Sequence, residues 1–116
     1  YVDKVHVDKS NPKKLSQPSY TPIHFNGACD SDYYPSNGEI VIHDELRKRA
    51  IKINRKGSNS VVVWNVYDGA KSLSDMGDDD YKKYVCVEAA NVQGDIIKLE
   101  PGQEHVLSFT ATILKE

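Results

Sequence analysis

One carboxylate stands out in YKKYVCVEAAN, residues 81–91, which otherwise has the composition of a buried β-strand. In a strand, Cys86, Glu88 and Ala90 share one face and the two valines lie on the other. Both faces look apolar, so we expect Glu88 to sit on a largely buried wall. An unpaired buried charge is costly, so such a residue is either paired or functional. A buried carboxyl group holds its proton more tightly, which suits a general base working near neutral pH. The alternative is a glutamate at a strand end that faces solvent or pairs with a lysine.

A second group of polar side chains lies in CDSDYY, residues 29–34. Asp30 and Asp32 follow a short strand-like run and stand beside two tyrosines. Aromatic rings next to carboxylates can bind sugars, because the ring covers apolar C–H faces while the acid accepts hydrogen bonds from hydroxyls. A turn in which the aspartates bind the local backbone is the competing interpretation.

No metal site is predicted. The acidic group at residues 75–81 lacks the alternating oxygen ligands and the distal glutamate of an EF-hand loop. Its members are Asp75, Asp78, Asp79 and Asp80. We expect a solvated helix start instead, where acids suit the helix dipole. The histidines are scattered without HxH or HExxH spacing and are His6, His24, His43 and His105.

Strand-like runs, separated by turns, make up most of the chain, so the expected fold class is all-β and mostly antiparallel, of sandwich type. The expected strands lie at residues 1–7, 22–25, 39–43, 50–54, 61–66, 84–90, 95–99 and 105–114. The runs at residues 39–43 and 50–54 alternate between apolar and polar residues, and a charged turn is expected between them, at residues 44–49. Residues 8–22 are expected to form a long surface loop, and residues 72–84 are the helical candidate, of one or two turns. Trp64 follows three valines and is expected to anchor the core. In the last strand, alternation predicts one buried face. That face carries Leu107, Phe109, Ala111 and Ile113.

Length and composition describe one soluble globular domain. The chain has 116 residues, of which 28% are charged, and a formal net charge of −2. Nothing in it is basic enough to indicate nucleic-acid binding, and no apolar run suggests a membrane span or a signal peptide. Cys29 and Cys86 form no CxxC pair, which favours a reducing compartment, the cytoplasm, although one disulfide remains open.

Taken in order, these segments resemble the C-terminal part of the glucose-6-phosphate 1-epimerase family. These are the hexose-6-phosphate mutarotases, a branch of the aldose 1-epimerases that includes plant apospory-associated protein C-like sequences. The resemblance rests on YVDKV, CDSDYY, VVVWN, KSLSDMGDDDYKKYVCVEAANV and IKLEPGQEHVLS, beginning at residues 1, 29, 61, 71 and 97. It covers essentially the whole chain but less than half of such an enzyme.

The resemblance implies a galactose-mutarotase-like β-supersandwich of which residues 1–116 form the C-terminal part of a single domain, the N-terminal half being absent. It also implies interconversion of the α and β anomers of a hexose 6-phosphate, without metal or cofactor. In the family, a base takes the proton of the anomeric hydroxyl and an acid protonates the ring oxygen. The base is the glutamate of the C-x-E motif, which falls on Glu88. A substrate-binding aspartate of the D-R-x-Y motif falls on Asp30, with Tyr33 as the tyrosine.

The chain departs from the family pattern at several positions. Ser31 and Asp32 replace the arginine and the small apolar residue of D-R-x-Y, and Val66 and Tyr67 replace a proline–aromatic pair. The family's catalytic histidine and phosphate-binding arginines lie in the N-terminal half, so the expected partners are that half, in the same protein or as a cleaved chain, and the sugar phosphate. Residues 1–116 alone are expected to be inactive. Two alternatives remain open: a non-catalytic carbohydrate-binding or interaction module, and an epimerase for unphosphorylated sugars.

Overall fold

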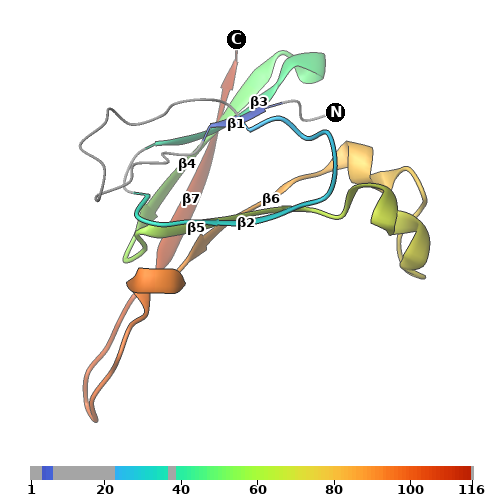
Figure 1. Ribbon diagram of the computed structural model, residues 1–116. Helices are drawn as coiled ribbons and strands as arrows, with labels where there is room; N and C mark the ends of the chain where they lie inside the picture. Colours follow the sequence, from blue (N-terminus) through green and yellow to red (C-terminus); the bar gives the residue numbers. More distant parts are fainter. Residues whose placement is uncertain (1–3, 7–22, 37–38, 116) are drawn as a thin grey trace.

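The described part of the chain contains seven strands and four short 3₁₀ helices. A computed structural model describes residues 4–6, 23–36 and 39–115, and the surface loop expected at residues 8–22 lies outside these ranges (Figure 1). The strands are β1 Lys4–His6, β2 Cys29–Tyr33, β3 Ile40–Asp44, β4 Arg49–Lys56, β5 Ser60–Asn65, β6 Cys86–Ala90 and β7 Ser108–Lys115. The 3₁₀ helices are η1 Glu45–Arg47, η2 Tyr67–Ser72, η3 Asp80–Lys83 and η4 Gln93–Asp95.

The strands form two antiparallel sheets, as the sequence predicts for an all-β sandwich. One sheet has the order β1-β3-β4-β7 and the other the order β2-β5-β6 (Figure 1). All five strand pairings are antiparallel. Within the described residues, no helix is long and apolar enough to cross a membrane.

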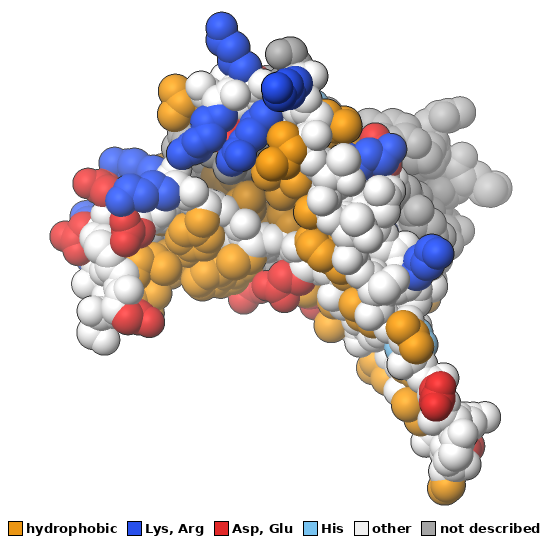
Figure 2. Space-filling model, turned by 180° about the vertical axis from the view of Figure 1, so that it is seen from behind, with side chains coloured by type: hydrophobic (Ala, Val, Ile, Leu, Met, Phe, Trp, Pro, Cys, Tyr) orange, Lys and Arg blue, Asp and Glu red, His pale blue; other side chains and the backbone are white. Residues whose placement is uncertain are grey.

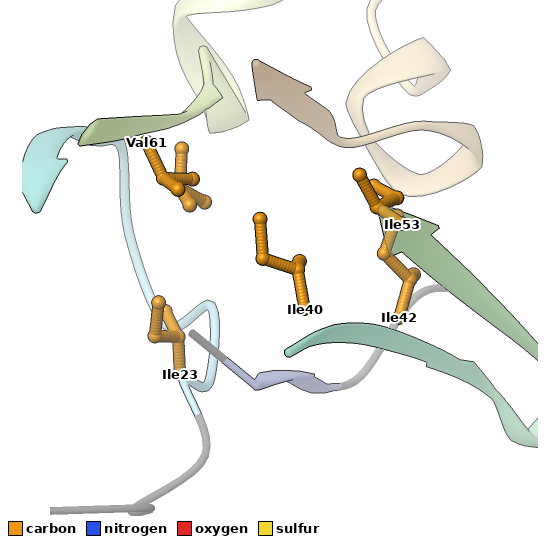
Figure 3. Close-up of a cluster of buried hydrophobic side chains, with 6 residues drawn as sticks. Ile23, Ile40, Ile42, Ile53 and Val61 are labelled. Carbon is orange, nitrogen blue, oxygen red and sulfur yellow. The ribbon is translucent and has the colours of Figure 1, made fainter. Parts of the chain in front are cut away.

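The core lies between the inner faces of the two sheets. Ile40, Ile42 and Ile53 come from the first sheet, and Val61 and Val63 come from β5 of the second (Figure 3). Burial of side chains of this size stabilises the fold by about 1.5–3 kcal/mol each. The alternation that predicted these strands is therefore confirmed: Ile40 and Ile42 are buried, and Val41 between them is only partly buried.

A charged turn joins β3 to β4. The buried carboxylate of Asp44 accepts a hydrogen bond from Nε of Arg49 at 2.9 Å and one from the backbone N–H of Arg47 at 3.3 Å. Burial alone would raise the pKa of Asp44, but the bonds from the two arginines outweigh it and lower that pKa. Lys48 completes the turn in the left-handed region, at φ 49°. The turn predicted for residues 44–49 is confirmed.

The last strand, β7, differs from the sequence prediction. Phe109 and Ile113 do share a face with the core side of β4, since they oppose Arg55 and Ile51. They are nevertheless 49% and 60% exposed. The physical reason is that β7 lies at the edge of the four-stranded sheet, and no strand of the three-stranded sheet packs over it in the described residues. Apolar side chains are accordingly visible on this side of the molecule (Figure 2).

Three other expectations need correction. The segment expected as a strand at residues 95–99 starts in η4 and then leaves the body as a thin projection that returns at the turn near Gly102 (Figure 1). The strand expected at residues 22–25 is reduced to a single bridge at Ile23. The helical candidate contains only the short 3₁₀ helix η3 and the end of η2, rather than an α-helix.

Candidate functional site

Sheet β2-β5-β6 turns one side toward the core and the other toward solvent. We call the second side the open face and define it by Asp30, Asp32, Val62, Trp64, Cys86 and Glu88. Two rows of paired residues cross it: Asp30–Trp64–Cys86 and Asp32–Val62–Glu88. Directly opposed residues of an antiparallel pair lie on the same side of a sheet, so both sequence-predicted site residues, Asp30 and Glu88, belong to this face.

Glu88 lies in the middle of β6 and is exposed, so the predicted burial on an apolar wall is wrong. In the described part of the chain, no second layer covers this side of β6. Its cross-strand neighbour is Val62, and Cys86 precedes it on the same face. A strand fixes the direction of the carboxylate, and solvent access leaves it open to a ligand.

Asp30 is also exposed, and it lies inside β2 rather than in the turn that was the competing interpretation. Neighbouring strands are about 4.8 Å apart and residues along a strand about 3.3 Å, so the Cα atoms of Asp30 and Glu88 are about 12 Å apart. Tyr33 points the other way, into the core, where burial raises its pKa above the ordinary tyrosine value. Tyr33, the tyrosine of the motif, therefore lies on the opposite face of the sheet from Asp30.

Trp64 lies at the centre of the open face and does not anchor the core, contrary to expectation. Its ring packs against Tyr84 with centroids 5.9 Å apart. Trp64 is partly buried, and Val62, two residues earlier on the same face, is partly buried as well. The two side chains give the open face an apolar floor between Asp30 on β2 and Glu88 on β6.

Asn65 connects this floor to the segment before β6, a role that the sequence did not reveal. It is buried; its Nδ2 donates to the carbonyl oxygens of Tyr84 at 2.8 Å and Tyr81 at 3.0 Å, and its Oδ1 accepts from the N–H of Tyr67 at 2.8 Å. The two carbonyl oxygens and the N–H group belong to the backbone and would otherwise need hydrogen bonds with water. Asn65 thereby holds Tyr84 beside Trp64.

The acidic segment before β6 is a solvated 3₁₀ turn, close to the helix start expected for it. Asp79 pairs with Lys82, and Asp80 pairs with Lys83, each at 2.6 Å. Hydrogen bonds from these lysines lower the pKa of both aspartates. The described residues contain no group of three His, Cys, Asp or Glu side chains that could hold a metal ion.

A second buried carboxylate, Asp95 in η4, was also missed. It accepts hydrogen bonds from the backbone N–H of Asn59 at 2.7 Å and from Nδ2 of Asn91 at 2.9 Å. Burial acts to raise its pKa, but these bonds and one from Ser60 lower it. In the sequence Asp95 looked like the polar start of a strand, and nothing in a single sequence marks such long-range partners.

The two cysteines lie on opposite faces of the sheet. Cys29 opposes Asn65 and packs against the core, while Cys86 opposes Trp64 on the open face. The strand β5 separates them, so the disulfide left open by the sequence is excluded in this fold. Burial, together with the nearby carboxylate of Glu88, raises the pKa of the Cys86 thiol.

Two cavities lie away from the open face. One of about 370 Å³ is lined by residues of β4 and the following turn, and one of about 180 Å³ lies beside Asp44 and Tyr84. His105 is also remote, because its Nε2 lies 2.8 Å from the carbonyl oxygen of Gly57 and 3.1 Å from Oδ1 of Asn91. The open face is therefore the place where the predicted site residues come together.

Comparison with known proteins assigns a family. Residues 3–112 match the family described as aldose 1-epimerase. A protein of Cenchrus ciliaris named "Putative glucose-6-phosphate 1-epimerase" is 33% identical over 100 residues, covering 85% of this chain and 30% of that protein. A protein of Escherichia coli (strain K12) with the same name is 35% identical over 91 residues, covering 78% of this chain and 29% of that protein. No solved structure matches the chain.

The chain therefore spans about 30% of the length of the curated relatives it matches. The family match, in contrast, runs over nearly all of the sequence. The chain belongs to the aldose 1-epimerase family.

Proposed function

We propose that this chain is the C-terminal part of a hexose-6-phosphate 1-epimerase, which interconverts the α and β anomers of glucose 6-phosphate or a close relative. The observation that carries the proposal is the placement of Glu88 and Asp30 on one open face of a single sheet, in a chain of this family. The names of two relatives support the sugar phosphate as substrate. The two free thiols accord with a cytoplasmic location.

In the proposed reaction, Glu88 is the general base. It takes the proton from the anomeric hydroxyl while an acid gives a proton to the ring oxygen, and the bond between the anomeric carbon and the ring oxygen breaks. The open-chain aldehyde rotates about the C1–C2 bond, and the reverse transfers close the ring as the other anomer. Asp30 accepts a hydrogen bond from a sugar hydroxyl, and Val62 and Trp64 lie under the ring.

The acid is supplied from outside this chain. Strands β2, β5 and β6 contain no histidine, and His43 belongs to β3 of the other sheet. The uncovered apolar row of β7 supports the same idea, because a face that carries Phe109 and Ile113 calls for a further layer. We therefore propose that an N-terminal half completes both the sandwich and the site, and that residues 1–116 alone are inactive.

The test uses the complete protein that contains this chain. Two-dimensional exchange NMR on glucose 6-phosphate measures the rate of anomer interconversion above the spontaneous rate. Replacing Glu88 by Gln is expected to lower that enzymatic rate by about 10²–10⁴-fold, because a general base contributes about that much. Glu104→Gln is the matched control, since Glu104 is exposed and lies on the remote projection. Full activity in the Glu88 variant would refute the base assignment.

A non-catalytic carbohydrate-binding role is the second candidate. It is favoured by the floor of Val62 and Trp64 beside Asp30, which can hold a sugar without an acid opposite Glu88. Binding of glucose 6-phosphate without faster anomer exchange in the complete protein would support this role. An epimerase for unphosphorylated sugars would instead accelerate the exchange of glucose and not of glucose 6-phosphate.

A further inference from the structure

Asp32 occupies a position on the open face that the reaction described so far does not use. It opposes Val62 on β5, which in turn opposes Glu88 on β6. Two strand spacings separate Asp32 from Glu88, so their Cα atoms lie about 10 Å apart, with the apolar side chain of Val62 between them. Asp32 is exposed and lies in the same row as Glu88, whereas Asp30 lies in the neighbouring row.

The carboxylate of Asp32 is oriented by a neighbour from a distant part of the chain. Nε2 of Gln93 donates a hydrogen bond of 2.8 Å to Oδ2 of Asp32. The other oxygen, Oδ1, forms no hydrogen bond with any described residue, so it can accept one from a ligand. Gln93 has a left-handed backbone, at φ 57°, which is unusual for a residue other than glycine.

The helix that carries Gln93 is fixed in place. Asp95 ties η4 to the turn before β5 through its bond from the backbone N–H of Asn59. Gly94 packs so closely on the ring of Tyr34 that a Cβ atom at this position would collide with the ring. The helix that carries Gln93 is therefore bonded to Asn59 and packed against Tyr34, and these contacts position Gln93 beside Asp32.

We propose that Asp32, oriented by Gln93, is a second sugar-binding residue that accepts a hydrogen bond from one specific hydroxyl of the substrate. In this arrangement the ring of the sugar lies over Val62 and beside Glu88. This inference rests on the proposed function. A ring in that place has Glu88 at one side and Asp32 at the other. The Asp32 contact thus fixes which edge of the sugar faces the base, and it contributes to specificity among hexose phosphates that differ in one hydroxyl.

The test pairs variants of the protein with variants of the ligand. In the complete protein carrying Glu88→Gln, calorimetry measures the affinity for glucose 6-phosphate and for its 2-, 3- and 4-deoxy analogues. Replacing Asp32 by Ala is expected to weaken glucose 6-phosphate binding about tenfold to a hundredfold, because a hydrogen bond to a charged group is lost. The same replacement should leave the affinity for one deoxy analogue nearly unchanged, since that analogue lacks the hydroxyl concerned.

Gln93→Ala should cause a smaller loss with the same pattern across the analogues. Asp75→Asn should cause none, because Asp75 is exposed and forms no hydrogen bond with the described residues. A merely structural role for Asp32 would weaken all four sugars equally, and that result would overturn the inference. So would unchanged affinity for all four. Neither outcome touches the proposed function, which fails separately if the complete protein with Glu88 intact neither binds glucose 6-phosphate nor speeds its anomer exchange.

Discussion

Replacing Asp95 by asparagine tests whether a buried charge holds the end of the open face. The side chain is 8% exposed. Its Oδ2 accepts from the backbone N–H of Asn59 at 2.7 Å and from Nδ2 of Asn91 at 2.9 Å, and Oγ of Ser60 lies 3.2 Å away. Asparagine preserves the shape of the side chain and can keep an oxygen at the position of Oδ2, but it removes the charge and puts an amide group in place of Oδ1, which accepts a long bond of 3.3 Å from Nδ2 of Asn59.

The expected loss of stability follows from counting the bonds. The Ser60 hydroxyl has one proton and lies nearer to the carbonyl oxygen of Ala90, at 2.7 Å, and the bond from Nδ2 of Asn59 to Oδ1 is long, at 3.3 Å. Only the two short bonds to Oδ2, from the backbone N–H of Asn59 and from Nδ2 of Asn91, are counted. A hydrogen bond to a charged group contributes about 1.5–3 kcal/mol and a neutral one about 0.5–1.5 kcal/mol. Changing the acceptor of two bonds from a charged to a neutral group therefore lowers the free energy of unfolding by about 2 kcal/mol near neutral pH.

The loss must also depend on pH. Burial acts to raise the pKa of Asp95, but its hydrogen bonds outweigh burial and lower the pKa in the folded state. A carboxyl group with a lowered folded pKa contributes stability above its unfolded pKa of about 3.9, and this contribution disappears as the pH falls through the folded pKa. The difference between the native protein and Asp95→Asn should thus shrink between pH 7 and pH 3.

Urea denaturation of the complete protein, followed by circular dichroism at pH 7, 5 and 3.5, measures this difference. Asp68→Asn is the matched control, because Asp68 is exposed and forms no hydrogen bond with the described residues. The reasoning is refuted if Asp95→Asn is as harmless as the control at pH 7. A loss of about 2 kcal/mol that stays constant with pH would refute the role of charge.

Two further predictions follow from carboxylates on either side of the sandwich. Iodoacetamide should alkylate Cys86 slowly at pH 7.5, because burial and the carboxylate of Glu88 raise the pKa of that thiol. The reaction, followed by peptide mass spectrometry, should be faster in the Glu88→Gln variant. An equal rate in both proteins would contradict the placement of Cys86 and Glu88 on one face. Asp44→Ala should destabilise the complete protein by about 3 kcal/mol in urea denaturation at pH 7, because it leaves Arg49 without its buried partner. This loss should become smaller as the pH falls below about 4, since the pKa of Asp44 is lowered in the folded state. A loss under about 1 kcal/mol at pH 7 would show that the ion pair is dispensable.

Much of the fold followed from period-two alternation. The strands around Ile40 and Ile53 have their apolar residues on the core side, as predicted, because both pack against the opposite sheet. The turn at residues 44–49 was equally predictable, since charged residues interrupt two alternating runs there. Local pattern and tertiary packing agree in these elements.

The errors about burial share one physical cause. Alternation identifies which residues share a face, but not what covers that face. Phe109 and Ile113 share a face as predicted, yet nothing in the described residues covers them. Glu88 and Trp64 were assigned to buried surroundings because their neighbours in sequence are apolar, and both belong to the side of the sheet that is open.

The contacts of Asn65, Gln93 and Asp95 could not be predicted for a different reason. Gln93 meets Asp32 across 61 positions of sequence, and Asp95 meets Asn59 across 36. Such pairs depend on how η4 returns to the sheet, and no local pattern encodes that return. The family resemblance pointed to Glu88 and Asp30, while the polar residues that position the open face emerged only from the coordinates.

Among the residues that the structure describes, the core-side row of β7 and the open face lack a covering layer, and their chemistry distinguishes them. The core-side row of β7 is apolar at Phe109 and Ile113, so exposure is unfavourable and a further layer would stabilise it. The open face has carboxylates at Asp32 and Glu88, which are stable in water and would be costly to bury without partners. The first surface therefore serves folding. The second suits a ligand that brings its own hydrogen-bond donors, as a sugar does, and for that reason the proposed epimerase chemistry is placed on the side of the sheet where Glu88 is exposed.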